Sequence, residues 1–256
     1  MPLRKLLPLL VALAFAAPAV AAEKIAIIKA DDVRNLNGKW DRFIKLSQEH
    51  GANPCLGIIL NSLEKPDPAY EAWLKKTAET GRVEFWNHGW DHKQWEEDGK
   101  KKSEFGNSGY EHQKEALAKS QAAALRVFGK PIVAFGSGFN AMDMDTAKAL
   151  NEVPELKLIF VYSGAQPSRA LKGKVLLPMA LRGENDGTGK PNFAKFKEDY
   201  ATKNNDKLTF AALQFHPMGF SEQGFTDFAA IVDFLKAEGW TFMLPSEYAR
   251  KLPASP

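Results

Sequence analysis

The chain has 256 residues, of which 45% are hydrophobic and 25% charged. This composition is that of a folded globular protein and excludes a disordered chain, a collagen-like repeat and a coiled coil. The formal charge of +3 is too small for the electrostatic footprint of a nucleic-acid-binding protein. The single cysteine, Cys55, excludes an internal disulfide and a zinc site built from cysteines.

The first segment has the pattern of a secretory signal peptide. A basic start is followed by a short apolar run and by small residues that end at Ala22. We therefore expect residues 1–22 to be removed and 23–256 to form a single domain that is exported to a periplasm or secreted. An uncleaved anchor is the alternative, although Pro8 and Pro18 interrupt the run. No other stretch is apolar enough to cross a bilayer, so we expect no stable membrane insertion after cleavage.

Predicted strands and helices alternate along the rest of the chain. Short runs rich in β-branched and aromatic residues predict strands at 24–30, 56–60, 83–86, 132–135, 158–162, 175–177, 208–215 and 241–244. Helical spacing of apolar residues predicts helices at 39–50, 68–80, 110–128, 142–153, 193–200, 225–238 and from 245 onward. The polar stretches 93–108 and 183–191 are expected to be loops.

About seven β–α units without a break in composition predict one α/β domain with parallel strands. This count favours closure into a barrel, and an open doubly wound sheet is the alternative. No glycine-rich phosphate-binding fingerprint follows the first strand, which weakens a nucleotide-binding version of that alternative.

Polar residues gather where the predicted strands end, which is where parallel α/β folds place their active sites. Asp31 and Asp32 follow the first strand, His88 and His92 follow the third, and His216 follows the strand at 208–215. Three of the five histidines therefore belong to the same end of the sheet.

The four-residue spacing of His88 and His92 would bring both imidazoles to one side of a helical turn. Two imidazoles and a carboxylate can hold a divalent cation and leave positions open for water. Two exposed loop histidines are the alternative, and each aspartate could instead cap a helix. The same ligand types also suit a non-haem iron oxygenase, although the β–α alternation opposes the β-sandwich that usually houses one.

Together these motifs resemble those of the polysaccharide deacetylases, the NodB-homology superfamily of carbohydrate esterases. The matching features are an Asp-Asp pair, a His-(Ser/Thr)-x-x-His motif and a Leu-x-x-His motif. Their counterparts here are Asp31–Asp32, His88–His92 and Leu213–His216. The resemblance spans the chain from Ile25 to about Leu244.

The resemblance implies a distorted (β/α)7-type barrel with parallel strands. It implies that Asp32, His88 and His92 bind one divalent metal ion, usually zinc, that Asp31 is the general base and that His216 is the general acid. The expected activity is a metal-dependent hydrolysis that removes acetyl groups from an acetylated amino sugar or polysaccharide. A non-catalytic carbohydrate-binding protein on the same scaffold is the alternative, and the oligomeric state is left open.

Three features depart from the family pattern. Gly89 stands where a serine or threonine usually fixes the loop of the metal histidines. The segment 136–140 replaces the Arg-x-Pro motif, whose arginine holds the catalytic aspartate, and Arg182 is the stand-in that we suggest. The Asp-Trp motif that orients the acid histidine has no counterpart.

Aromatic side chains near the histidine motif could stack on a sugar ring. Trp86 lies within a predicted strand and is expected to belong to the core, whereas Trp90 and Trp95 could either line a substrate groove or pack in the core. Asn140 and Arg182 are the other candidates for substrate contacts.

Overall fold

The computed structural model describes residues 22–162 and 166–252, so residues 1–21 of the predicted signal peptide lie outside the described residues. One sheet contains most of the strands. They are β1 (Lys24–Val33), β2 (Pro54–Ile58), β3 (Glu84–Asn87), β6 (Ala134–Phe135), β7 (Leu158–Val161), β8 (Val175–Pro178), β9 (Phe210–Phe215) and β10 (Trp240–Phe242).

All pairings within this sheet are parallel, and β1 pairs with three other strands. The order is β10-β1-β2-β3-β6-β7-β8, and β9 pairs with β1 as well. A bridge between Leu181 and Leu213 joins the end of β8 to β9. Seven of the strands therefore form a nearly closed barrel. The remaining strand, β10, lies beside the beginning of β1. The predicted (β/α)7-type barrel with parallel strands is confirmed.

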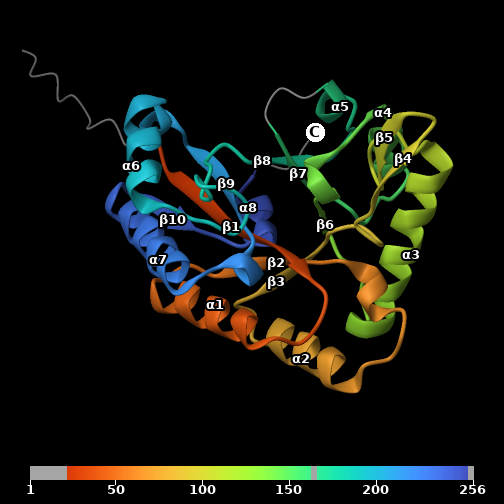
Figure 1. The fold of residues 1–256 in the computed structure, drawn as a ribbon, viewed down its shortest axis with the longest axis horizontal. Coiled ribbons are helices and arrows are strands. Elements are labelled where there is room, and N and C mark those ends of the chain that lie inside the picture. Colours follow the sequence, from red (N-terminus) through yellow and green to blue (C-terminus); the bar gives the residue numbers. More distant parts are fainter. Residues whose placement is uncertain (1–21, 163–165, 253–256) are drawn as a thin grey trace, which may run out of the picture.

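Helices cover the outside of the strands, as Figure 1 shows for α6, α7, α1, α2 and α3. The helices are α1 (Gly38–Glu49), α2 (Pro68–Glu79), α3 (Tyr110–Phe128), α4 (Met144–Asn151), α5 (Gln166–Arg169), α6 (Phe193–Thr202), α7 (Glu222–Ala237) and α8 (Pro245–Lys251). Within the described ranges, none of these helices has the length and apolar character needed to span a membrane.

Local chemistry explains where several helices begin and end. The side chain of Asn37 accepts a hydrogen bond from the backbone N–H of Lys39 at the start of α1. Asp67 caps α2 in the same way, and Pro68 takes its first position. Gly129 ends α3 in the left-handed conformation, with φ of 67°.

The stretch 93–108, which we predicted to be a loop, contains an antiparallel hairpin of β4 (Gln94–Glu97) and β5 (Lys100–Ser103). Its two-residue turn is Asp98–Gly99, and both residues have positive φ. An Asp-Gly pair is a strong signal for such a turn. The prediction was wrong because the strands are short, polar and exposed, with no apolar alternation to reveal them.

Candidate active site

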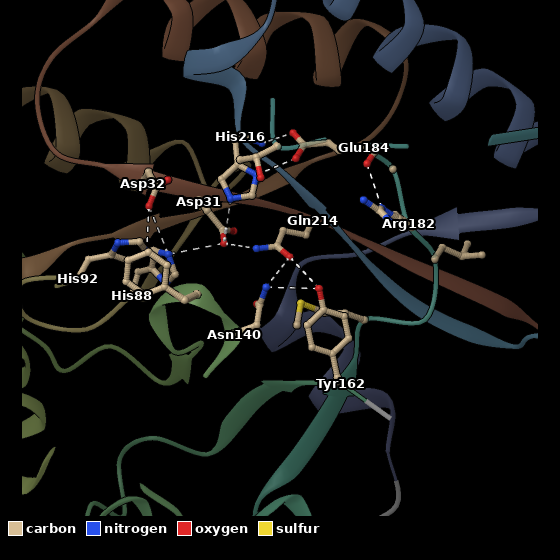
Figure 2. A pocket seen from close by; sticks show the side chains of 15 residues that line it. Asp31, Asp32, His88, His92, Asn140, Tyr162, Arg182, Glu184, Gln214 and His216 are labelled. Carbon is tan, nitrogen blue, oxygen red and sulfur yellow. Dashed lines mark hydrogen bonds and ion pairs between the residues drawn. The ribbon is translucent and has the colours of Figure 1, made fainter. Parts of the chain in front are cut away.

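One pocket of about 650 Å³ opens at the carboxyl ends of the barrel strands (Figure 2). Most of the residues predicted for the site line it together, although they come from five separate segments of the chain. These residues are Asp31, Asp32, His88, His92, Asn140, Arg182 and His216. Trp90 and Trp95 are not among the described residues that line it. Trp90 packs against the core, and the ring of Trp95 on β4 lies 5.4 Å from that of His112.

A β-bulge brings both aspartates to the same pocket. Consecutive strand residues normally face opposite sides of a sheet. The pairing of β1 with β2 shifts its register between Ala30 and Val33, and Asp32 has a φ of 75°. Such a bulge changes the direction of a side chain, so Asp31 and Asp32 both reach the pocket.

Asp32, His88 and His92 form a compact set of groups that could hold a metal ion, with one candidate ligand atom from each lying within 4.8 Å of the others. Asp32 Oδ1 lies 3.4 Å from Nε2 of His88 and 3.5 Å from Nε2 of His92. That oxygen is buried and has no hydrogen-bond partner among the described residues. A buried carboxylate oxygen without a donor fits a site that a cation would complete.

The two histidines present Nε2 for ligation. Nδ1 of His88 lies 2.8 Å from the carbonyl oxygen of Gly136, so an Nδ1–H donates there and leaves the lone pair of Nε2 for a metal. A Cβ on Gly138 would lie 2.5 Å from the ring of His92, so this glycine allows the backbone to approach the imidazole closely.

The segment 88–92 is a loop and contains none of the helical turn that the spacing suggested. Glu104 holds this loop: its buried carboxylate accepts hydrogen bonds from the backbone N–H groups of Trp90, Asp91 and His92. Gly89 has a φ of 84°, and a Cβ there would lie 2.5 Å from Glu104 Oε2. The carboxylate of Glu104 therefore occupies the space that a side chain at position 89 would need.

The electrostatics favour the protonation states that metal ligands require. Burial raises the pKa of Asp32, but the neighbouring imidazoles of His88, His92 and His216 outweigh it and hold that pKa well below its usual range. Burial and the charge of His88 lower the pKa of His92 to about 4. At neutral pH Asp32 is a carboxylate and His92 a neutral imidazole.

Asp31 is held by Lys29 and not by Arg182. Lys29 Nζ lies 2.5 Å from Asp31 Oδ1 and 2.6 Å from Oδ2, and both side chains are about 1% exposed. Gln214 Nε2 donates to Asp31 Oδ2 at 2.7 Å. Our suggestion that Arg182 replaces the family's arginine is therefore wrong. Arg182 is exposed and its Nε donates to the carbonyl oxygen of Glu184.

His216 is oriented by Glu184, which follows β8. The carboxylate accepts from the backbone N–H of His216 at 2.5 Å and lies 2.7 Å from Nδ1. Nε2 therefore faces the pocket, 3.9 Å from Asp31 Oδ2. Burial lowers the pKa of His216, but the hydrogen bond to Glu184 and the charge of Asp31 outweigh it and raise that pKa above its ordinary value.

A polar network forms the wall opposite His216 (Figure 2). Asn140 Nδ2 donates to Gln214 Oε1 at 3.1 Å and to the hydroxyl of Tyr162 at 3.3 Å. Because the Gln214 oxygen is occupied in this way, its Nε2 faces Asp31. Arg182 lies on the side of the pocket away from Asp32, His88 and His92.

Left-handed backbone concentrates around the pocket. Four non-glycine residues with φ between 53° and 75° line it: Asp32, His92, Phe139 and Asn140. Each such residue costs on the order of 1–3 kcal/mol and persists only where the surroundings hold it. Sequence patterns give no sign of this strain, and they also missed Lys29, Glu104, Phe139, Tyr162, Glu184 and Gln214.

No protein-family profile matches the sequence, and no curated protein matches it either. Solved structures do match its fold. A family 4 acetyl xylan esterase from Clostridium thermocellum, in complex with a cobalt ion, has a TM-score of 0.61 at 13% identity, covering 90% of this chain and 93% of that one. A family 4 domain of a multidomain xylanase from the hindgut metagenome of Trinervitermes trinervoides has a TM-score of 0.58 at 14% identity, covering 90% and 91%.

A family 4 pseudoenzyme from Bacillus anthracis is also similar, with a TM-score of 0.60 at 10% identity over 86% of this chain and 63% of that one. A mutant of that pseudoenzyme has restored enzymatic activity. The chain therefore has the fold of the family 4 carbohydrate esterases, and the resemblance to polysaccharide deacetylases is confirmed at the level of the fold.

Proposed function

We propose that this protein is a metal-dependent hydrolase that removes acetyl groups from an acetylated amino sugar or polysaccharide. One observation carries the proposal: the candidate base, the candidate acid and the three candidate metal ligands line one pocket. Each family feature that the sequence lacks has a substitute in contact with the same partner. Lys29 binds Asp31, Glu184 binds His216, and Glu104 binds the histidine loop.

Asp32, His88 and His92 would hold one divalent ion, for which we propose Zn²⁺ because imidazole and carboxylate groups suit it. When bound, such an ion lowers the pKa of water and polarises a carbonyl group. The unpartnered Asp32 oxygen and the fixed Nδ1–H of His88 support this ligand set. The rival iron oxygenase is not supported by the barrel fold.

The residues around this site would then perform an amide or ester hydrolysis. Asp31 accepts a proton from the water that attacks the acetyl carbon. As the bond from that carbon to the sugar nitrogen or oxygen breaks, Nε2 of His216 donates its proton to the departing amine or alcohol. The products are acetate and the free sugar group. Glu184 keeps His216 oriented throughout, and Lys29 and Gln214 do the same for Asp31.

The test is acetate release from a panel of N- and O-acetylated glycans by protein loaded with Zn²⁺. We expect release from at least one member, and loss of release after chelation. Wild-type protein that binds the metal and releases no acetate from the panel would contradict the proposal.

The alternative, a non-catalytic carbohydrate-binding protein, is favoured by the pseudoenzyme among the structural neighbours. It predicts that the metal-loaded protein binds a glycan of the panel without releasing acetate. Against it stands the presence of both Asp31 and His216 beside the metal ligands, since a binding protein needs neither a base nor an acid.

We also propose that the protein is exported, because residues 1–22 have the pattern of a secretory signal peptide. Mass spectrometry of the protein from its native host should find an N-terminus near Ala22 or Glu23. A full-length cytosolic product would contradict export and leave the proposed chemistry unaffected.

A further inference from the structure

Lys29 is a lysine in the interior of the barrel, with 1% of its surface exposed. Lysine is almost never fully buried unless it is paired. Strand alternation places Lys29 and Asp31, two residues apart on β1, on the same face, and the ammonium lies within 2.6 Å of both carboxylate oxygens. The buried ammonium of Lys29 is therefore paired with Asp31, the proposed base.

Two aromatic rings lie beside the ammonium of Lys29. Nζ lies 4.3 Å from the centre of the Trp86 ring and 5.4 Å from that of Phe160, and these aromatic faces stabilise a cation. A Cβ on Gly136 would lie 2.8 Å from Trp86 Cζ3 and 3.4 Å from Lys29 Cε. Gly136 begins the segment that replaces the Arg-x-Pro motif, and its lack of a side chain leaves room for Lys29.

We propose that Lys29 is the positioning residue for Asp31, holding the carboxylate from within β1 in the role that the family gives to an arginine from another segment. This inference rests on the proposed function. Lys29 holds both oxygens and Gln214 holds Oδ2, so the carboxylate cannot rotate. Oδ2 is thereby kept 3.6 Å from Nε2 of His88 and 3.9 Å from Nε2 of His216, between the metal site and the acid.

A double-mutant cycle tests this role. Lys29→Met should lower kcat by about 10²-fold, which is the effect of misplacing a reacting group. KM and metal content should stay nearly unchanged, because Lys29 is not one of the described residues that line the pocket. In an Asp31→Asn background the same change should cause no further loss. A near-normal kcat in Lys29→Met, or an equal loss in both backgrounds, would overturn the proposal.

Arg126→Met is the matched control, because it removes the cation of a partly buried ion pair with Glu71, 2.8 Å long, outside the pocket. Its kcat should equal that of the wild type. If Lys29→Met does not fold, Lys29→Met/Asp31→Asn, which buries no unpaired charge, is compared with Asp31→Asn alone. Equal residual kcat supports the proposal, and a further loss overturns it.

Thermal melting tests the pairing independently of activity. Each single variant leaves one buried charge without its partner and should lower Tm by roughly 10 °C, whereas the double variant should lose much less. Additive losses would overturn the pairing. Wild-type protein without acetate release would instead count against the proposed function, and the melting cycle would still decide whether Lys29 serves Asp31.

Discussion

Two hollows in the described part of the barrel differ in chemistry. The pocket of about 650 Å³ lies at the carboxyl ends of the strands and gathers histidines and carboxylates. A second cavity of about 350 Å³ lies where β3 and β6 begin, beside the start of α8, and its wall is largely apolar. Glu84 is a half-buried carboxylate in that second cavity.

Glu84 and Asp32 differ in how their carboxylate oxygens are bound. Both oxygens of Glu84 are bound by Ser246, through its backbone N–H and its hydroxyl, each at 2.9 Å. Asp32 Oδ1 is buried without a donor among the described residues. In the wall of the second cavity, the residue with left-handed backbone is a glycine, Gly81. In the pocket, four non-glycine residues have left-handed backbone. The unpartnered Asp32 oxygen and the four strained residues therefore distinguish the pocket from the second cavity.

The largest effect should come from removing a metal ligand. His88→Ala and His92→Ala each reduce the ligand set to two, so bound metal and acetate release should fall together, with activity lower by at least about 10³-fold. His50→Ala, which removes a histidine paired with Asp233 on the surface, is the control. Elemental analysis of purified variants measures the metal. Full metal content in both ligand variants would refute the assignment.

His216→Ala should have the next largest effect. The acid contributes roughly 10²- to 10⁴-fold, so kcat on an N-acetyl substrate should fall by that factor while metal content and Tm stay near the wild-type values. The loss on an O-acetyl ester should be smaller, because an alkoxide leaves more readily than an amide ion. Loss of the metal would make His216 a ligand, and a near-normal kcat on the amide would remove it from the mechanism.

The fold could be predicted because its signals are local. The periodic apolar residues of α3 gave its bounds, 110–128, without error, and buried strands stood out as short β-branched runs. The exposed β4–β5 hairpin was not predicted, because its strands bury little apolar surface. Similarly, the Asp-Asp and His-x-x-x-His motifs mark the pocket because they follow strands directly.

The supporting residues could not be found in the same way, because their partners are distant in sequence. Glu184 binds a histidine 32 residues away, and Glu104 binds a loop 12 residues before it. Nothing local distinguishes either carboxylate from a solvated one. Lys29 is different: a lysine within a buried strand, two residues before Asp31, was a signal that strand alternation could have used.

Substituting one glycine near each hollow should sharpen the contrast. Gly81→Ser places a side chain at a φ of 66° with nothing within 4 Å, so it should cost roughly 1 kcal/mol of unfolding free energy and leave activity intact. Gly89→Ser adds a clash with Glu104, so it should cost roughly 1–3 kcal/mol more. It should also lower bound metal, because Glu104 would release the histidine loop. Equal Tm losses with normal metal in both variants would contradict this account.

The smallest effect is expected for Glu84→Gln in the second cavity. Burial raises the pKa of Glu84 above its ordinary value of 4.5, although the hydrogen bonds from Ser246 oppose the shift. The folded chain therefore holds this proton at a pH where the unfolded chain has lost it, and the free energy of unfolding falls as pH rises from about 4.5 through the raised pKa. Glutamine cannot titrate, so the stability of the variant relative to the wild type should increase over that interval and then level off.

Urea unfolding at a series of pH values measures the difference, with Glu238→Gln, an exposed carboxylate on the same chain, as the control for loss of a charge. Acetate release should not change, because Glu84 lies outside the pocket. Parallel pH profiles for the wild type and Glu84→Gln would show that burial of this carboxylate does not affect stability, and a drop in activity would mean that the two hollows are coupled.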